Sequence, residues 1–202
     1  QPIETGFQPT ITIRAHGNLT VQGWSEPRLS VRTPGDSPQV EQEAEDAWRL
    51  SATEDLQVYV PQAARLIVEA AHGDSQITGV GGNIIVQDCH GNLVLAQSGP
   101  ATLHNIDGDA NIHTAAGGLN VEDIAGNLAI HRIQGPLQVR SCSGDLAAKE
   151  IQGPVEIESV KGNANVKDVQ GPLALTSVSG DLMAKNVAGP AIIHSVGGNA
   201  ML

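Results

Sequence analysis

The chain has few aromatic residues and few cations. Its 202 residues include one Phe, one Tyr and two Trp, and all four lie within the first sixty positions. Lys and Arg total 11 against 22 Asp and Glu, which gives a formal net charge of −11. We therefore expect no nucleic-acid partner, because nucleic acid requires a basic surface. No uninterrupted apolar run approaches the roughly 20 residues of a membrane span, so we expect no membrane insertion.

Glycine, in contrast, is abundant and recurs at a fixed spacing. From position 108 onward every ninth residue is a glycine, namely Gly108, Gly117, Gly126, Gly135, Gly144, Gly153, Gly162, Gly171, Gly180, Gly189 and Gly198. The third, fifth and eighth places of each nine-residue unit are apolar in nearly every copy. Pro follows one set of glycines and Asn or Asp follows the alternate set, so the full repeat is eighteen residues. A fixed period of this kind is typical of repeat architectures.

Each nine-residue unit predicts one short β-strand followed by a corner. The third and fifth places project to the same side of an extended chain, because side chains alternate across a strand. Glycine followed by Pro, Asn or Asp is turn chemistry, since glycine tolerates positive φ and Asx side chains bond their own backbone. Two strands and two corners per eighteen residues predict an all-β fold, a single-stranded β-solenoid (β-helix) with coils about 4.8 Å apart.

Residues eighteen positions apart should then lie above one another in columns. One column alternates carboxylates with amides: Asp109, Asn127, Asp145, Asn163, Asp181 and Asn199. This order keeps carboxylates apart, and we expect each amide to donate to both of its neighbours. A second column is formed by Ser141, Ser159, Ser177 and Ser195. A third is formed by His113, His131, Lys149, Lys167 and Lys185.

The two cysteines, Cys89 and Cys142, both occupy the apolar eighth place of a unit. They lie 53 positions apart, which is three coils less one residue, or roughly 14 Å of stacking at about 4.8 Å per coil. A disulfide requires Cα atoms within about 7 Å. We therefore expect two buried free thiols, which leave the redox compartment open.

The chain is expected to form one continuous domain with an irregular beginning. Residues 64–202 form the regular repeats, whereas residues 1–63 keep only traces of the period and are interpreted as degenerate first coils and an aromatic N-terminal cap. Within this part, residues 34–47 are predicted to be an acidic loop. At the other end Ala200 and Leu202 stand at core places with nothing to cover them. The chain could be trimmed from a longer protein, dock there on another subunit, or fray.

The passage Val58-Tyr59-Val60-Pro61, followed by Leu66-Ile67-Val68, Gly73-Asp74 and the glycine-centred short strands, resembles the bacterial adhesin family of β-solenoid domains. The resemblance spans most of the chain. It implies a single-stranded β-solenoid at the cell envelope or surface. The family has no assigned function and supplies no catalytic residues to carry over.

Few residues suggest a catalytic or metal-binding role. The serine column has no base at a fixed offset, and the predicted acidic loop has no paired cation, so we expect no catalytic residues and no cofactor. The Gly-Gly-x-Gly-x-Asp pattern of calcium-binding nonapeptide repeats is missing. His72 and His90 fall at equivalent places on successive coils with Asp107 next, and could bind a transition metal if the side chains converge. Otherwise they are stacked surface histidines.

The function expected from the sequence is a non-enzymatic structural or adhesive β-solenoid, extracellular or on the cell surface. In the self-assembly version, Ala200 and Leu202 of the last coil stack on Ile11 and Ile13 of the next subunit, which builds a head-to-tail filament. In the adhesin version, a monomer binds a cell-surface or cell-wall glycan. Lys149, Lys167 and Lys185 could face the anions of an acidic polysaccharide, or be an ordinary solvated face. A polysaccharide-active enzyme is the remaining alternative.

Overall fold

A computed structural model describes residues 2–35 and 37–202 of the chain, and these residues form two long β-sheets that face each other. Sheet I has twelve strands, in spatial order β1 (Ile3–Glu4), β4 (Arg28–Arg32), β7 (Leu56–Pro61), β3 (Leu19–Trp24), β9 (Ser75–Thr78), β11 (Leu93–Ser98), β13 (Ala110–Ala115), β15 (Leu128–Ile133), β17 (Leu146–Ile151), β19 (Ala164–Val169), β21 (Leu182–Val187) and β23 (Ala200–Met201). Sheet II has eleven, in spatial order β5 (Gln39–Ala44), β6 (Ala47–Ala52), β2 (Thr10–Ala15), β8 (Arg65–Ala71), β10 (Ile84–Cys89), β12 (Ala101–Ile106), β14 (Leu119–Ile124), β16 (Leu137–Cys142), β18 (Val155–Val160), β20 (Leu173–Val178) and β22 (Ala191–Val196). The described chain contains no helix, so the predicted all-β solenoid is confirmed.

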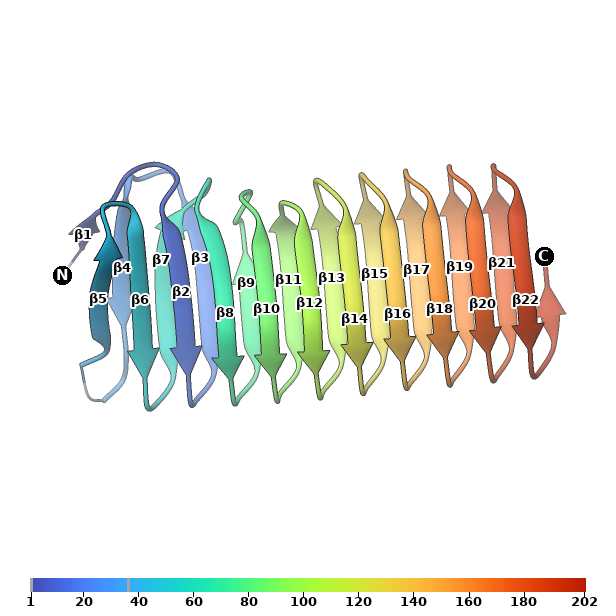
Figure 1. The fold of residues 1–202 in the computed structure, drawn as a ribbon, viewed down its shortest axis with the longest axis horizontal. Coiled ribbons are helices and arrows are strands. Elements are labelled where there is room, and N and C mark those ends of the chain that lie inside the picture. Colours follow the sequence, from blue (N-terminus) through green and yellow to red (C-terminus); the bar gives the residue numbers. More distant parts are fainter. Residues whose placement is uncertain (1, 36) are drawn as a thin grey trace.

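From β8 onward the chain alternates between the sheets, and each coil stacks on the one before it (Figure 1). Neighbouring strands are parallel and pair residues eighteen positions apart, for example Leu137 with Val155. The spacing is seventeen between β10 and β12 and between β11 and β13, as Ile84 with Ala101 shows. The third, fifth and eighth places of the regular units are buried, as Leu146, Ala148 and Ile151 of β17 illustrate. A thin aliphatic core therefore runs along the whole rod between the two sheets.

The recurring glycines are needed for close stacking and not for positive φ. Among the described glycines only Gly79 has a positive φ, of 73°. A Cβ atom built on Gly162 would lie 2.6 Å from the carbonyl oxygen of Gly144 and 2.3 Å from Oδ1 of Asp145. Contacts this short are forbidden to a side chain, so the corner accepts glycine alone. The expectation that positive φ explains the glycines is wrong for the regular corners.

Positive φ occurs instead at a non-glycine column in sheet I. The column consists of Gln97, Thr114, Arg132, Glu150, Asp168 and Asn186, with φ values of 52° to 64°. Each is the seventh place of its unit, between the inward fifth and eighth places. Strict alternation would place the fifth and eighth side chains on opposite faces. Both side chains nevertheless reach the core, in sheet I with a left-handed seventh place and in sheet II without one, as β16 shows.

The Asx column forms a continuous ladder of hydrogen bonds. The backbone N–H of each member donates to Oδ1 of the member below, as Asn163 does to Asp145 at 2.7 Å. The predicted vertical registry is therefore confirmed. Each amide, however, does not donate to both neighbours. Nδ2 of Asn127 donates to Asp109 at 3.2 Å, whereas its Oδ1 accepts the N–H of Asp145 at 2.9 Å.

The first coils are stacked out of sequence order. β2 lies between β6 and β8, and β3 lies between β7 and β9, so residues 10–24 form a coil inserted between two later ones. The Asx ladder passes through this inserted coil without a break. Asn18 donates its N–H to Asp55 at 2.8 Å and accepts the N–H of Asp74 at 2.9 Å.

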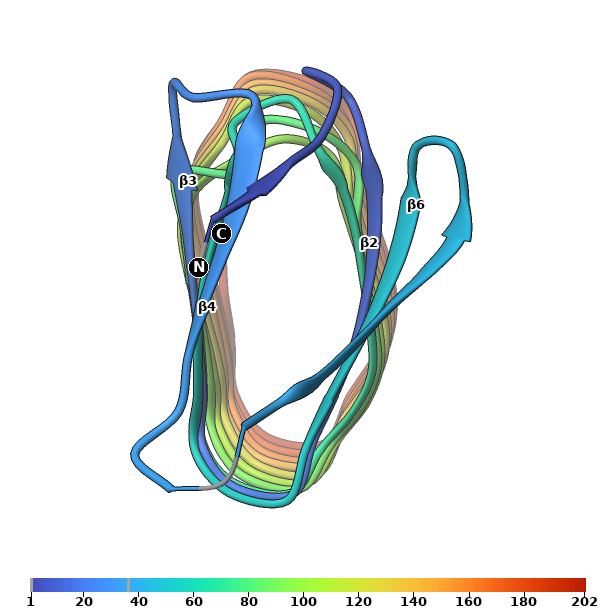
Figure 2. The same cartoon turned by 90° about the vertical axis from the view of Figure 1, so that its left-hand side faces the viewer.

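Residues 34–47 are not only a loop, because residues 39–44 form β5, which pairs antiparallel with β6. The strand is mostly exposed, but Val40 packs against the core, and Glu43 is hydrogen-bonded to Arg49 of β6 at 2.5 Å. Figure 2 shows β1, β4 and β5 across the N-terminal end of the rod. The Trp24 and Tyr59 rings lie 5.5 Å apart in neighbouring strands of sheet I.

Candidate functional site

A basic stripe runs along the outward side of sheet I. It consists of His113, His131, Lys149, Lys167 and Lys185, which are register partners on β13, β15, β17, β19 and β21. Each side chain occupies the sixth place of its unit and points away from the core, since the fifth place is buried. The column predicted from the sequence is therefore present as one continuous feature of the surface.

Like charges stacked in this way destabilise the folded state. Cross-strand neighbours of the same sign are destabilising, whereas opposite charges stabilise a sheet. The sixth place of sheet II obeys this preference: His104, Glu122, Arg140 and Glu158 alternate in sign, and His104 Nδ1 lies 2.9 Å from Glu122 Oε2. The stripe of sheet I keeps one sign over three successive lysines in a protein of net charge −11. The two outward faces therefore differ in charge pattern.

Among the described residues, only the middle of the stripe lies close to a carboxylate. Glu150 Oε1 lies 3.2 Å from His131 Nε2 and 3.6 Å from Lys149 Nζ. Burial raises the pKa of Glu150, but the hydrogen bond from Arg132 and the surrounding positive charges outweigh burial and lower that pKa overall. No carboxylate of the described chain lies within 4.0 Å of the Lys167 or Lys185 ammonium group.

Asp168, the acidic residue beside Lys167, accepts a hydrogen bond from Asn186 Nδ2 at 2.8 Å. No cation of the described stripe residues lies within 4.0 Å of its carboxylate oxygens.

Beside the stripe lies a shallow groove of about 250 Å³. Its lining includes the small side chains of Ala129 and Ala147, the amides of Asn111 and Asn165, and four members of the stripe, His113, His131, Lys149 and Lys167. The Oδ1 atom of Asn165 is buried and has no hydrogen-bond partner within the described chain. A buried acceptor without a partner is costly. The groove thus combines cations, amides and small apolar side chains.

The histidines predicted as weak metal ligands lie in one stack that is longer than expected. The His72 and His90 rings are 5.1 Å apart, and His90 Nδ1 lies 2.6 Å from Asp107 Oδ2. His16 joins the stack with its ring 4.8 Å from that of His72. The rings meet edge to face, and no group of three or more His, Cys, Asp or Glu side chains in the described chain is placed to hold a metal ion.

Sequence spacing could not reveal His16, because only the inserted coil brings it beside His72.

Cys89 and Cys142 are buried and unpaired, as predicted. Burial raises the pKa of both thiols, and hydrogen bonds to Ser75 for Cys89 and to the backbone for Cys142 oppose this only in part. The Cys142 sulfur lies 3.6 Å from the carbonyl oxygen of Gly126. A protonated thiol enclosed in the core is inert as a nucleophile.

The expected assembly interface is contradicted at its N-terminal half. Ile11 and Ile13 are 0 % exposed, because β2 pairs with β6 on one side and β8 on the other. They cannot receive the last coil of another subunit. At the C-terminal end Ala200 is exposed and Leu202 is 77 % exposed. The inserted coil, which the sequence pattern does not reveal, is the reason for the error.

Residues 2–200 match the model of the family described as Toastrack DUF4097. No curated protein and no solved structure matches the chain at a significant level. None of the described residues forms a helix able to cross a membrane.

Proposed function

The chain belongs to the Toastrack DUF4097 family, and from this premise we propose that it is a non-enzymatic binding module for a linear acidic polysaccharide. The polysaccharide lies along the basic stripe and in the groove beside it. The proposal places the protein outside the cell or on the cell surface, where such polymers occur. An adhesive role follows from it, with the glycan as partner.

The observation that carries the proposal is the unbroken run of lysines in register. Three ammonium groups about 4.8 Å apart repel one another, and a ligand that supplies negative charge removes this repulsion. Lys167 and Lys185 have no carboxylate partner within the described chain. Three lysines in register on an otherwise acidic protein form a local surface that favours the binding of an anion.

The residues that line the groove indicate which kind of anion binds there. Ala129 and Ala147 offer small apolar side chains, which suit the C–H face of a sugar ring. Asn111 and Asn165 line the groove with side-chain amides, which can hydrogen-bond to hydroxyl groups. A polymer that repeats both carboxylates and hydroxyls fits this set. Nucleic acid fits less well, because duplex DNA carries about one charge per 1.7 Å, a denser charge than one carboxylate per sugar, and the net charge of −11 repels it more strongly.

The proposal is tested by calorimetric titration with polygalacturonate at low salt, with neutral dextran as control polymer. We expect polygalacturonate to bind and dextran not to bind. The double variant Lys167→Gln with Lys185→Gln should bind about tenfold more weakly or worse, and added salt should weaken the wild type more than the variant. Lys161→Gln, an exposed lysine outside the stripe, is the matched control and should bind as the wild type does.

Equal affinity of the double variant and the wild type would overturn the proposal, as would binding of dextran with similar strength. Loss of binding cannot be attributed to unfolding if the double variant melts no lower than the wild type. We expect its stability to rise slightly, since two like charges are removed.

A further inference from the structure

A wide groove lies at the N-terminal end of sheet II, where the fold departs from the regular coil. β4 and β5 pair antiparallel with β7 and β6, unlike the parallel strands of the regular coils, and Figure 2 shows β5 and β6 leaning away from the flat sheet. The groove measures about 450 Å³, and its lining includes Arg14, His16, Gln39, Ser51 and Thr53. This volume is within the range of small-molecule sites, about 300–1,000 Å³.

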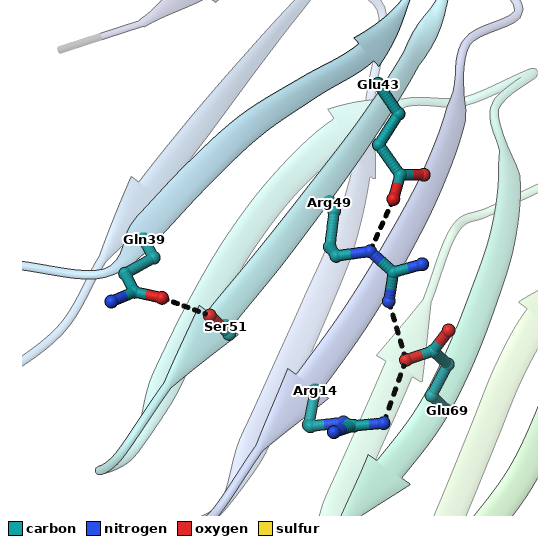
Figure 3. Close-up of polar contacts among 6 residues, drawn as sticks. All are labelled: Arg14, Gln39, Glu43, Arg49, Ser51 and Glu69. Atoms are coloured by element: carbon teal, nitrogen blue, oxygen red, sulfur yellow. Dashed lines mark hydrogen bonds and ion pairs between the residues drawn. The ribbon is translucent and has the colours of Figure 1, made fainter.

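Three of these side chains stand in one row across neighbouring strands. Gln39 of β5 is the register partner of Ser51 of β6, and Ser51 is the partner of Arg14 of β2. The same row is visible in Figure 3, where Ser51 lies beside Gln39. Ser51 Oγ donates to Gln39 Oε1 at 3.2 Å, so the amide N–H groups of Gln39 remain free to donate to a ligand.

Arg14 supplies the charge of the groove. A β-bulge shifts the pairing of β2 with β8, so that Arg14 aligns with Ala70 and not with Glu69. One nitrogen, Nη2, contacts Glu69 Oε2 at 3.3 Å, and the side chain is 57 % exposed. Glu69 is held more closely by Arg49 at 2.7 Å (Figure 3). The guanidinium of Arg14 therefore keeps N–H donors for another anion.

His16 adds an acceptor. Its Nδ1 atom lies 3.2 Å from the carbonyl oxygen of Ala52, which can only accept, so Nδ1 carries the hydrogen. In the neutral ring Nε2 is then an acceptor for a hydroxyl group. None of the described residues that line this groove is acidic. The groove therefore has one cation, free donors and one acceptor.

We infer that this groove is a second binding site, for a hydroxylated monocarboxylate the size of one sugar, such as a uronic acid. The carboxylate pairs with the guanidinium of Arg14, the amide of Gln39 donates to a hydroxyl oxygen, and a ligand hydroxyl donates to Nε2 of His16. Arg recognises carboxylates through two parallel N–H donors, which sets the orientation of the ligand. This site is separate from the basic stripe and does not depend on the polymer-binding proposal.

The test is calorimetric titration of the folded chain with sodium glucuronate, with glucose as the neutral control of equal size. We expect glucuronate to bind in the millimolar range or tighter and glucose to bind far more weakly. Arg14→Gln should weaken glucuronate binding by about 10- to 100-fold, the range expected for a lost charge-assisted hydrogen bond. Arg65→Gln, an exposed arginine of the adjacent strand β8, is the matched control and should have no effect.

Two further variants separate binding from folding. Arg14→Lys keeps the charge and should retain part of the affinity lost in Arg14→Gln. Thr53→Val keeps the side-chain shape and should weaken binding only several-fold. Unchanged binding in Arg14→Gln, or no binding of glucuronate to the wild type, would overturn the inference. The stripe variant with Lys167→Gln and Lys185→Gln should still bind glucuronate, so this proposal and the polymer proposal fail independently.

Discussion

At the scale of single residues, the solenoid is limited by how closely its corners stack. Gly162 sits over Gly144 and Asp145 so tightly that a Cβ atom has no room, although its φ is ordinary. The strained backbone lies elsewhere, at the left-handed seventh places such as Glu150, where φ is 59°. The steric limit on stacking therefore falls on the corner glycine, and the left-handed backbone conformation falls on the seventh residue of the same repeat.

Gly162→Ala should destabilise the protein by about 2–4 kcal/mol, because the added Cβ forces the backbone of two coils apart. The free energy of unfolding by urea is the measurement. Gly118→Ala is the matched control, because a Cβ there meets Pro136 Cγ at 3.2 Å and no backbone atom closer than 3.4 Å. A similar loss of stability in both variants would show that stacking distance is not what selects glycine.

At the scale of elements, the Asx ladder holds each coil to the one below. It alternates between carboxylate and amide in space even where the chain order is broken, as Asp55, Asn18 and Asp74 show. In sequence order Asp55 and Asp74 would be neighbours. Their carboxylates are separated only because the coil of β2 and β3 is inserted between them.

Asn18→Asp should therefore place three carboxylates in succession and destabilise the protein by about 1–2 kcal/mol at neutral pH. The loss should shrink when salt is added, since the groups are exposed and screened. Asn163→Asp, in the regular coils, is the matched comparison and should behave alike. Chemical denaturation at low and high salt checks this. An effect of Asn163→Asp without one of Asn18→Asp would contradict the inserted coil.

At the scale of the whole molecule, the two ends of the rod differ (Figure 1). Antiparallel strands β1, β4 and β5 complete the N-terminal end. At the other end the side chains of β22 and β23 lose burial, and Ile192 is 57 % exposed and Met201 55 % exposed. Each coil of a solenoid is stabilised by its neighbours, so a coil with one neighbour is weaker.

Hydrogen exchange in the 202-residue chain should follow this gradient. Amides of β22 and β23 should exchange faster than those of β14 to β18, because local opening costs less free energy where one neighbouring coil is missing. Mass spectrometry of peptic fragments measures the exchange. Protection in β22 equal to that in β16 would contradict a coil stabilised from one side only.

The repeating coil is specified by local sequence. Glycine every ninth residue and apolar third, fifth and eighth places recur in each unit, so register, core and columns such as Lys149, Lys167 and Lys185 follow from local information. The buried thiols Cys89 and Cys142 follow in the same way.

The position of the first coils, in contrast, depends on long-range pairing. The insertion of β2 and β3 buries Ile11 and Ile13 and brings His16 beside His72, and no period predicts it because the pairing joins residues far apart in the chain. The same is true of β5, whose exposed acidic sequence is extended only because β6 pairs with it. Periodicity specifies what each coil looks like, but long-range backbone pairing specifies which coil lies next to which.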